Sequence, residues 1–193
     1  MNPPRVRRRR AADLDGCVAA LADVHRVDRY PLNWPADPHR WLREPRPARA
    51  WVAVDTAGTI VGHVAVHRLP DPADEPRADP TAEVARLFVA PAARGLALGS
   101  TLLARARHWA DARGVRLVLE VVADGAAAVA LYERTGWRYT GSSTASWTAP
   151  DGSPVSLRRY TVRSDADPAI AASRRASRAA ASRSSAGSTT STS

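Results

Sequence analysis

The stretch that most constrains the fold of this chain runs from Glu83 to Leu103, with the sequence EVARLFVAPAARGLALGSTLL. Its first part has the apolar and β-branched residues of a buried strand, and Pro91 ends that strand. A short loop rich in small residues follows, and from Leu98 the apolar residues recur at helical spacing. Such a strand–loop–helix passage points free backbone N–H groups at the helix N-terminus, where they and the helix dipole favour an anion such as a phosphate.

The two common phosphate-binding fingerprints do not fit this loop. All of the basic residues are arginine, and without a lysine the chain cannot form a Walker-type loop. A dinucleotide-binding loop needs glycines at three fixed positions, and only Gly95 and Gly99 are present here. Small residues that merely allow a strand and a helix to pack at a corner remain an alternative interpretation.

The loop Arg94-Gly95-Leu96-Ala97-Leu98-Gly99 resembles the pyrophosphate loop of the GCN5-related N-acetyltransferase (GNAT) family. In that loop Gln or Arg is followed by two free positions, Gly, one free position, and Gly or Ala. Arg94 and Gly99 stand at the two ends of the pattern, but Ala97 replaces the central glycine. A methyl group there would crowd an amide that approaches a phosphate unless φ is negative. We expect Ala97 to be accommodated as the first residue of the helix.

A second segment, LEVVADGAAAVALYERTGW, resembles the second cofactor motif of the same family. That motif has Asn, then Ala three residues later, then Leu-Tyr-Glu, and then Gly and an aromatic residue. The matching residues are Ala128, Leu131, Tyr132, Glu133, Gly136 and Trp137. Gly125 stands where Asn is usual, so one side-chain contact to the cofactor is missing. Two motifs in the right order, at about the right distance, strengthen the resemblance.

The resemblance implies an α/β domain over residues 11–163, with a mixed, mostly antiparallel sheet of six to seven strands and helices on both faces. Periodicity in the sequence predicts the same alternation of elements. Helices are expected over 14–25, 37–42, 98–113 and 126–135, with Asp13 and Asp37 as caps of the first two. Strands are expected over 50–55, 59–68, 81–89, 116–122, 137–147 and 155–162. The proline-rich segment 69–80 is predicted to be a loop whose acids could attract an amine.

The resemblance further implies acetyl-coenzyme A as co-substrate, bound in a V-shaped opening between the central strand and the next one. Its pyrophosphate would rest beside Arg94 on the amides of Gly95, Leu96, Ala97, Leu98, Gly99 and Ser100. Backbone groups of Leu87, Phe88 and Val89 would hold the pantetheine and the acetyl carbonyl, and an amide near Phe88 or Val89 would stabilise the oxyanion. No metal ion is required.

Glu83 and Tyr132 are the candidate catalytic residues. Strand alternation places Glu83, Ala85, Leu87 and Val89 on one face, so Glu83 is a carboxylate in a strand otherwise suited to burial. Burial would raise its pKa, and family members often use a glutamate here as base; an ion pair with Arg86 or Arg94 is the structural alternative. Tyr132 would protonate the departing thiolate, or would simply pack against the sheet.

The implied activity is transfer of an acetyl group to a primary amine by direct attack, and we favour a small-molecule acceptor. Acetylation of a protein N-terminus or lysine remains an alternative, as does a non-catalytic acyl-coenzyme A-binding regulator. In this family the region between the first two helices borders the acceptor pocket, which makes Tyr30 and Trp34 candidates for substrate contacts or for packing. A homodimer is left open.

The net charge of +9 is concentrated at the two ends of the chain. Residues 1–10 contain five arginines and no acid, and residues 164–193 contain four arginines against two aspartates. We predict that 1–10 is a solvated, unfolded arm and that 164–193, rich in Ser, Ala, Arg and Thr, is a disordered tail. Such ends would bind nucleic acid only weakly and in a salt-dependent way.

The remaining features predict a cytoplasmic protein. The single cysteine, Cys17, cannot form an internal disulfide and sits among apolar helix positions. No apolar run approaches the roughly 18 residues of a membrane span, and no apolar segment follows the first arginines as in a secretory signal. His63 and His67 share a strand face without a Cys or carboxylate at metal-ligand spacing, so no zinc site is expected.

Overall fold

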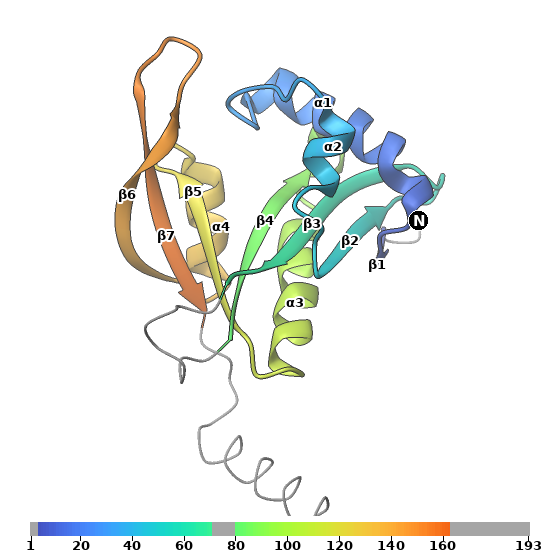
Figure 1. Ribbon diagram of the computed structural model, residues 1–193. Coiled ribbons are helices and arrows are strands. Elements are labelled where there is room, and N and C mark those ends of the chain that lie inside the picture. The colour runs from blue at the N-terminus through green and yellow to red at the C-terminus, as the bar shows by residue number, and fades with distance from the viewer. Residues whose placement is uncertain (1–3, 71–79, 163–193) are drawn as a thin grey trace, which may run out of the picture.

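A computed structural model describes residues 4–70 and 80–162 of the chain (Figure 1). Its strands are β1 (Arg5–Arg8), β2 (Arg49–Val54), β3 (Ile60–Arg68), β4 (Thr81–Val89), β5 (Arg116–Val122), β6 (Arg138–Thr148) and β7 (Pro154–Val162). Its helices are α1 (Leu14–Asp28), α2 (Pro38–Arg43), α3 (Leu98–Asp111) and α4 (Ala126–Arg134). The expected helices and strands are all present, which confirms the α/β fold. The predicted tail at 164–193, and residues 71–79 of the predicted loop, lie outside the described residues.

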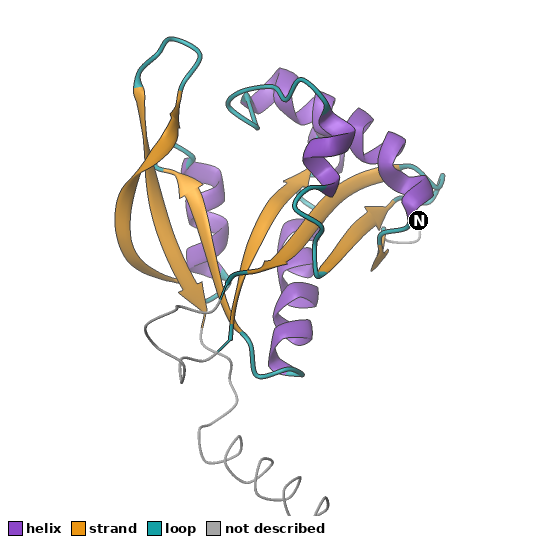
Figure 2. Cartoon of the chain, viewed as in Figure 1, coloured by secondary structure: helices purple, strands orange, loops and turns teal. Residues whose placement is uncertain are grey.

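The strands form one seven-stranded sheet in the order β1-β2-β3-β4-β5-β7-β6. Neighbouring strands are antiparallel except for the parallel pair β4 and β5. Helices α1 and α2 cover one face of the half that contains β2, β3 and β4, and α3 covers the other face of that half (Figures 1 and 2). Helix α4 packs behind β5 and β7. Helices therefore lie on both faces, as predicted.

The two parallel strands at the centre of the sheet diverge soon after they begin. Only Thr81–Glu83 of β4 pairs with β5, opposite Arg116–Val118. Further along, β5 pairs with β7 on its other side, while β4 continues to pair with β3. The backbone of β4 beyond Glu83 thus has an edge without a sheet neighbour, and Figure 1 shows the two ribbons spreading apart there.

One extra residue in β4 interrupts its regular pairing with β3. The register runs up to Ala65 opposite Ala85, and the next pair is His63 opposite Phe88, so two residues of β4 face one residue of β3. Arg86 lies in this bulge and has a φ of +54°, in the left-handed region that non-glycine residues rarely adopt. The bulge bends β4 at the point where it leaves β5.

The bulge also changes which side chains share a face in the second half of β4. Residues directly opposite each other in an antiparallel pair point to the same face. Phe88 therefore lies on the face of Glu83, and its ring stacks on His63 with 5.3 Å between the ring centroids. The prediction that Leu87 and Val89 share the face of Glu83 is wrong, because strict alternation does not survive an inserted residue.

Residues 4–10 do not form the unfolded arm that the charge pattern predicted for 1–10, and residues 1–3 lie outside the described residues. Arg5–Arg8 forms β1 at the edge of the sheet, antiparallel to β2, and the Arg9 N–H donates to the Ala50 carbonyl at 2.9 Å. The Arg9 guanidinium reaches inward, where it donates to the Leu42 carbonyl at 2.8 Å. The domain therefore begins before residue 11, since backbone pairing and inward hydrogen bonds hold an arginine-rich strand in place.

Asp13 has a different role from the predicted cap of α1. Its carboxylate accepts two hydrogen bonds from the Arg7 guanidinium, both at 2.7 Å, and one from the Arg10 N–H at 2.6 Å. No cap hydrogen bond from this side chain reaches α1. The hydrogen bonds from Arg7 hold the pKa of Asp13 below its usual value, and they tie β1 to the start of the first helix. Asp37, by contrast, caps α2 as predicted, since its carboxylate accepts from the Arg40 N–H at 2.9 Å.

The apolar core fills both sides of the sheet. Cys17 is fully buried in it, as predicted, and burial raises the pKa of its thiol to about 12. His63 and His67 are also buried, but the described residues contain no group of three side chains that could hold a metal ion. Among residues 4–70 and 80–162, no helix is long and apolar enough to cross a membrane.

Candidate active site

The segment that follows β4 delivers free backbone amides to the start of α3. A short 3-10 turn over Pro91–Ala93 leads into Arg94 and then Gly95, whose φ is +78°. The first i to i−4 backbone hydrogen bond of α3 runs from the Thr101 N–H to the Ala97 carbonyl, at 3.0 Å. The amides of Leu98, Gly99 and Ser100 therefore have no acceptor within the helix. This arrangement has the geometry that an anion-binding helix start requires.

Ala97 does not adopt the conformation that we predicted for it. It is the residue before the first turn of α3 rather than the first residue in the helix, and its φ of +53° and ψ of +20° are left-handed. For a residue with a Cβ this conformation costs about 1–2 kcal/mol, whereas glycine adopts it freely. The extended chain at Arg94 must turn sharply to enter α3, and the family's usual glycine would make this turn without strain.

The side chain of Arg94 is engaged within the fold. Its guanidinium forms an ion pair with Asp28, the last residue of α1. This contact fastens the loop before α3 to the end of α1, and both side chains remain partly exposed. Leu96, also predicted at the site, is 54% exposed at the surface of the loop.

Close packing at two glycines explains their presence near this loop. A Cβ atom built on Gly99 would lie 3.0 Å from a methyl carbon of Leu131 in α4, so glycine lets the start of α3 approach α4. At Gly125, the position where the family usually has Asn, a Cβ would lie 3.1 Å from the Val122 carbonyl oxygen. The chain therefore accommodates an Asn there only if the backbone around Val122 shifts.

Glu83 lies beside the point where β4 and β5 diverge, and no ion pair occupies it. Burial, followed by the nearby charge of Glu120, raises its pKa above the usual 4.5, against the opposing effects of Arg86 and Arg159. None of the described residues forms an ion pair with Glu83 within 4.0 Å, so the alternative of a structural ion pair with Arg86 or Arg94 is not found.

Arg86, expected from the sequence only as an ion-pair partner of Glu83, has its guanidinium bound by other groups. Its guanidinium donates to the Glu44 carbonyl at 2.5 Å and to Nε2 of His67 at 3.0 Å. Its charged end also lies over the Trp41 ring, 4.9 Å from the ring centroid. These contacts hold the guanidinium of Arg86 beside the end of α2 and next to His67, the residue that pairs with Glu83 across the sheet.

Two tyrosines, Tyr132 and Tyr30, interact electrostatically. Tyr132 in α4 is buried, and its ring packs against Trp137 and Tyr160 with centroid distances of 6.1 and 6.0 Å. Burial raises the pKa of Tyr132 well above its usual value. Burial also raises the pKa of Tyr30, with further increases from Tyr132 and Glu83 and a decrease from Arg86. Tyr30 is thus within electrostatic reach of both Tyr132 and Glu83.

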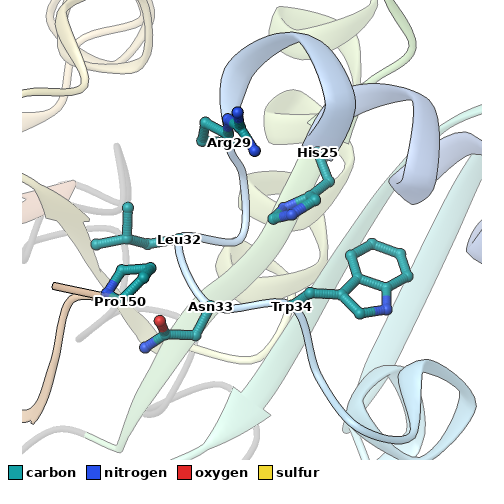
Figure 3. A pocket seen from close by; sticks show the side chains of 6 residues that line it. All are labelled: His25, Arg29, Leu32, Asn33, Trp34 and Pro150. Atoms are coloured by element: carbon teal, nitrogen blue, oxygen red, sulfur yellow. The ribbon is translucent and has the colours of Figure 1, made fainter.

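A hollow of about 510 Å³ lies where the connection between α1 and α2 meets the turn between β6 and β7 (Figure 3). The residues that line it are His25, Arg29, Leu32, Asn33, Trp34 and Pro150. Asn33 donates from Nδ2 to the Thr148 carbonyl at 2.8 Å, which joins the two segments. Trp34 stands in the wall of this hollow, while Tyr30 turns inward and packs against Trp41, with 6.4 Å between centroids.

Comparison with known proteins agrees with this architecture. The sequence profile of the acetyltransferase (GNAT) family matches residues 17–137. The chain belongs to this family, and it is an acyltransferase. No curated protein sequence matches it.

Solved structures with the same fold include an N-acetyltransferase from Staphylococcus aureus Mu50, which is 17% identical in sequence and has a TM-score of 0.68. The match covers 85% of this chain and 100% of that one. The ribosomal-protein-alanine N-acetyltransferase from Brucella melitensis is 26% identical, with a TM-score of 0.65, and the match covers 82% of this chain and 98% of that one. Arabidopsis thaliana NAA60 in complex with acetyl-CoA is 16% identical with a TM-score of 0.65, over 82% and 97% of the two chains.

Proposed function

We propose that this chain is an N-acetyltransferase that moves the acetyl group of acetyl-coenzyme A onto a primary amine by direct attack, without a metal ion. The observation that carries the proposal is the divergence of β4 and β5 beyond Glu83. The start of α3 follows β4 in the chain, and Tyr30 lies within electrostatic reach of both Glu83 and Tyr132. The similarity to a fold solved in complex with acetyl-CoA supports the choice of co-substrate.

The residues around the opening fit the phosphate and amide groups of coenzyme A. Backbone N–H groups from Gly95 to Ser100 would donate hydrogen bonds to the pyrophosphate, because the first amides of α3 have no acceptor in the helix. The backbone of Leu87, Phe88 and Val89 belongs to the part of β4 that has no neighbour on the β5 side. Its free N–H and C=O groups would pair with the amides of the pantetheine, as a missing strand would. A backbone N–H near Phe88 or Val89 would stabilise the developing oxyanion.

Glu83 would act as the base that prepares the amine for attack. A protonated amine is not nucleophilic, so a group near the acceptor must remove its proton, directly or through a water molecule. The raised pKa of Glu83, which results mainly from burial, makes it a better proton acceptor than an ordinary glutamate. The absence of an ion pair at Glu83 among the described residues leaves its carboxylate available for this role.

Tyr132 would supply the proton that the departing thiolate sulfur needs. The raised pKa of its phenol keeps the proton in place until a strong base forms beside it. A thiolate released in a site with little water is such a base. The rings of Trp137 and Tyr160 hold the ring of Tyr132 in position, so packing supports this role rather than excluding it.

The acceptor that we favour is a small molecule with a primary amine, which the hollow beside Trp34 could admit. A second candidate, a protein N-terminus, is favoured by the similarity to a ribosomal-protein-alanine N-acetyltransferase at 26% identity. The presence of both Glu83 and Tyr132 at the opening counts against a regulator that binds acyl-coenzyme A without catalysis.

The test is release of free thiol from acetyl-coenzyme A, measured with a panel of small amines and of short peptides that differ at the N-terminal residue. We expect release with at least one amine and little release without any, and the Glu83→Gln variant should lose most of the activity. Preference for peptides over every small amine would establish the second candidate. Tight binding of coenzyme A, seen by calorimetry, without release by any acceptor would contradict an enzymatic function.

A further inference from the structure

Arg9 and Arg86 are two half-buried arginines whose guanidinium groups have only uncharged partners. Arg9 donates to a main-chain carbonyl of α2 at 2.8 Å and contacts Nε2 of His63 at 2.9 Å. Arg86 donates to the Glu44 carbonyl and to Nε2 of His67. In the described part of the chain, neither guanidinium forms an ion pair with a carboxylate within 4.0 Å. Charges removed from water are ordinarily paired, so this cluster has an unmet need for an anion.

The two histidines that contact these arginines are neutral. A guanidinium group can only donate, so each Nε2 that it contacts must accept the hydrogen bond. Burial lowers the pKa of His63 to about 3 and that of His67 to about 4. Nδ1 of His63 then carries the ring proton and donates to the Arg86 carbonyl at 2.9 Å, which fixes the backbone of the bulge. The histidines therefore add no charge to the cluster, and they hold Arg86 in place.

The guanidinium of Arg86 is fixed but keeps free donors. Its φ of +54° is a conformation that persists only where the surroundings hold it, and such residues concentrate at functional sites. The Trp41 ring covers one face of the guanidinium, with 4.9 Å from its central carbon to the ring centroid. The Glu44 carbonyl and His67 engage two of its five N–H groups, and the other three form no hydrogen bond with the residues that the structure describes. These N–H groups lie in the guanidinium plane, where a planar carboxylate can accept two parallel hydrogen bonds.

Glu83 lies on the same face of the sheet as this guanidinium. His67 stands directly opposite Glu83 in the pairing of β3 with β4, and opposite residues point to the same face. The hydrogen bond from Arg86 to the His67 ring brings the guanidinium to that face, and the contact with Trp41 places it on the side of α2 (Figure 1). Arg86 and Glu83 shift each other's pKa without forming an ion pair, and both are partly exposed. A carboxylate and a guanidinium thus share one face without neutralising each other.

We infer that the acceptor is a free amino acid, whose amine Glu83 deprotonates while Arg86 binds its carboxylate. The inference rests on the proposed acetyl transfer and adds the class of substrate to it. A small molecule with both an amine and a carboxylate is complementary to these two side chains, whereas the charges of Arg86 and Arg9 would repel a polyamine. In a peptide, the carboxyl group next to the reacting amine has become a neutral amide, which would leave Arg86 without a counter-ion.

The experiment compares thiol release from acetyl-coenzyme A with free amino acids and with their carboxamides, which keep the amine and lose the negative charge. The panel contains the common α-amino acids, β-alanine and γ-aminobutyrate, each beside its amide, and phosphoethanolamine as an amine that carries a phosphate. For the best amino acid, kcat/KM should exceed that of its amide by about tenfold or more. The difference should lie mainly in KM, because Arg86 binds the acceptor equally before and during the reaction.

Arg86→Gln should reduce this preference for the acid over the amide to less than about twofold, since it removes the charged donor. The substitution also changes the pKa of Glu83, but that change affects both acceptors and cancels in the ratio. Arg86→Lys keeps the charge without the planar donors and should retain part of the preference. Arg43→Gln is the matched control, because it removes an exposed arginine from the end of α2 and should leave the preference unchanged.

Equal kcat/KM for amino acids and their amides in the parent enzyme would overturn the inference while acetyl transfer itself stood, and this comparison needs no variant. A preference that survives Arg86→Gln, in a variant that keeps the thermal unfolding midpoint of the parent, would overturn it as well. Higher kcat/KM with phosphoethanolamine than with every amino acid would contradict the choice of a carboxylate. Release with none of these acceptors, or with any amine, would contradict the proposed function and with it the inference.

Discussion

At the scale of single residues, the surroundings of Arg86 determine the basicity of Glu83. An ion pair with this arginine would lower the pKa of Glu83 and occupy its carboxylate. Instead, His67, the Glu44 carbonyl and the Trp41 ring take up the guanidinium, and its charge acts on Glu83 only from a distance. Burial then outweighs that charge, and the pKa of Glu83 rises.

Glu83→Gln tests this link between burial and catalysis. The base works only when it is deprotonated, so kcat/KM of the parent enzyme should rise with pH through the pKa of Glu83, which lies above the usual 4.5. The variant should lose roughly 10²–10⁴-fold in kcat/KM and should lack this acidic limb. A pH profile of thiol release measures both, and an unchanged acidic limb in the variant would assign that titration to another group.

Tyr132→Phe separates proton donation from packing at the same position. Phenylalanine keeps the ring that packs on Trp137 and Tyr160 and removes only the hydroxyl. We expect kcat to fall roughly 10²-fold or more, with affinity for coenzyme A within about twofold of the parent. Steady-state kinetics measures kcat, and calorimetry measures the affinity for coenzyme A. An unchanged kcat would show that Tyr132 has a purely structural role. Tyr30→Phe is the matched control, since Tyr30 is a second tyrosine that interacts electrostatically with Tyr132 but has no assigned proton transfer.

At the scale of elements, periodicity in the sequence located each of the helices α1 to α4 and the strands β2 to β7, because their buried faces follow regular spacing. Strand β1 escaped prediction because three of its four residues, and the two that follow, are arginines. The groups that hold this segment, β2, Asp13 and the Leu42 carbonyl, lie elsewhere in the chain. The bulge at Arg86 was not predicted either, because one inserted residue hardly changes the composition or the apolar spacing of the strand. It nevertheless moves the side chains that follow it in β4 to the opposite face of the sheet.

The left-handed conformation of Ala97, just before α3, can be tested by substitution. Ala97→Gly removes a strain of about 1–2 kcal/mol but makes the unfolded chain more flexible, which costs about 0.4–1 kcal/mol. The variant should therefore be as stable as the parent, or up to about 1.6 kcal/mol more stable. Urea unfolding measures this change in the free energy of unfolding.

Ala104→Gly is the matched control for that substitution, since Ala104 is exposed in the interior of the same helix. A glycine there should destabilise the chain by about 1 kcal/mol. Equal destabilisation by the two substitutions would contradict the left-handed conformation of Ala97. If the amides before α3 hold the pyrophosphate, Ala97→Gly should also bind coenzyme A at least as tightly as the parent, because it removes a methyl group from the loop.

At the scale of the whole molecule, the candidate site depends on segments that are far apart in sequence. Tyr30 comes from the connection after α1, Glu83 from β4 and Tyr132 from α4, and the sequence motifs predicted the last two. Motif spacing could not predict that Tyr30 approaches Tyr132, or that Arg94 pairs with Asp28, because such contacts depend on how the halves of the sheet pack. The same dependence on long-range contacts makes the N-terminal strand part of the domain.

Removal of residues 1–10 should therefore destabilise the fold rather than trim a loose arm. The truncation deletes the pairing of β1 with β2 and leaves the buried Asp13 carboxylate without the Arg7 guanidinium. An unsatisfied charged group of this kind costs about 1–3 kcal/mol or more, and the lost strand adds to that. Urea unfolding at pH 7 should show a loss of about 3 kcal/mol. Arg5→Gln, which alters an exposed side chain of the same strand, should change stability by less than about 0.5 kcal/mol.

The pH dependence of that loss separates the ion pair from the strand. The pKa of Asp13 in the folded parent lies below its usual 3.8, so the pair stabilises the fold above about pH 4 and this stabilisation disappears as the pH falls through the lowered pKa. In the truncated chain the carboxyl has lost Arg7, and acid protonates it at a higher pH. The difference in unfolding free energy between the two chains should thus shrink as the pH falls below about 4 and through the lowered pKa of the parent, and what remains once the carboxyl is protonated in both chains measures the strand alone. A difference that shows no such decrease would mean that the contact between Arg7 and Asp13 contributes nothing to the stability of the domain.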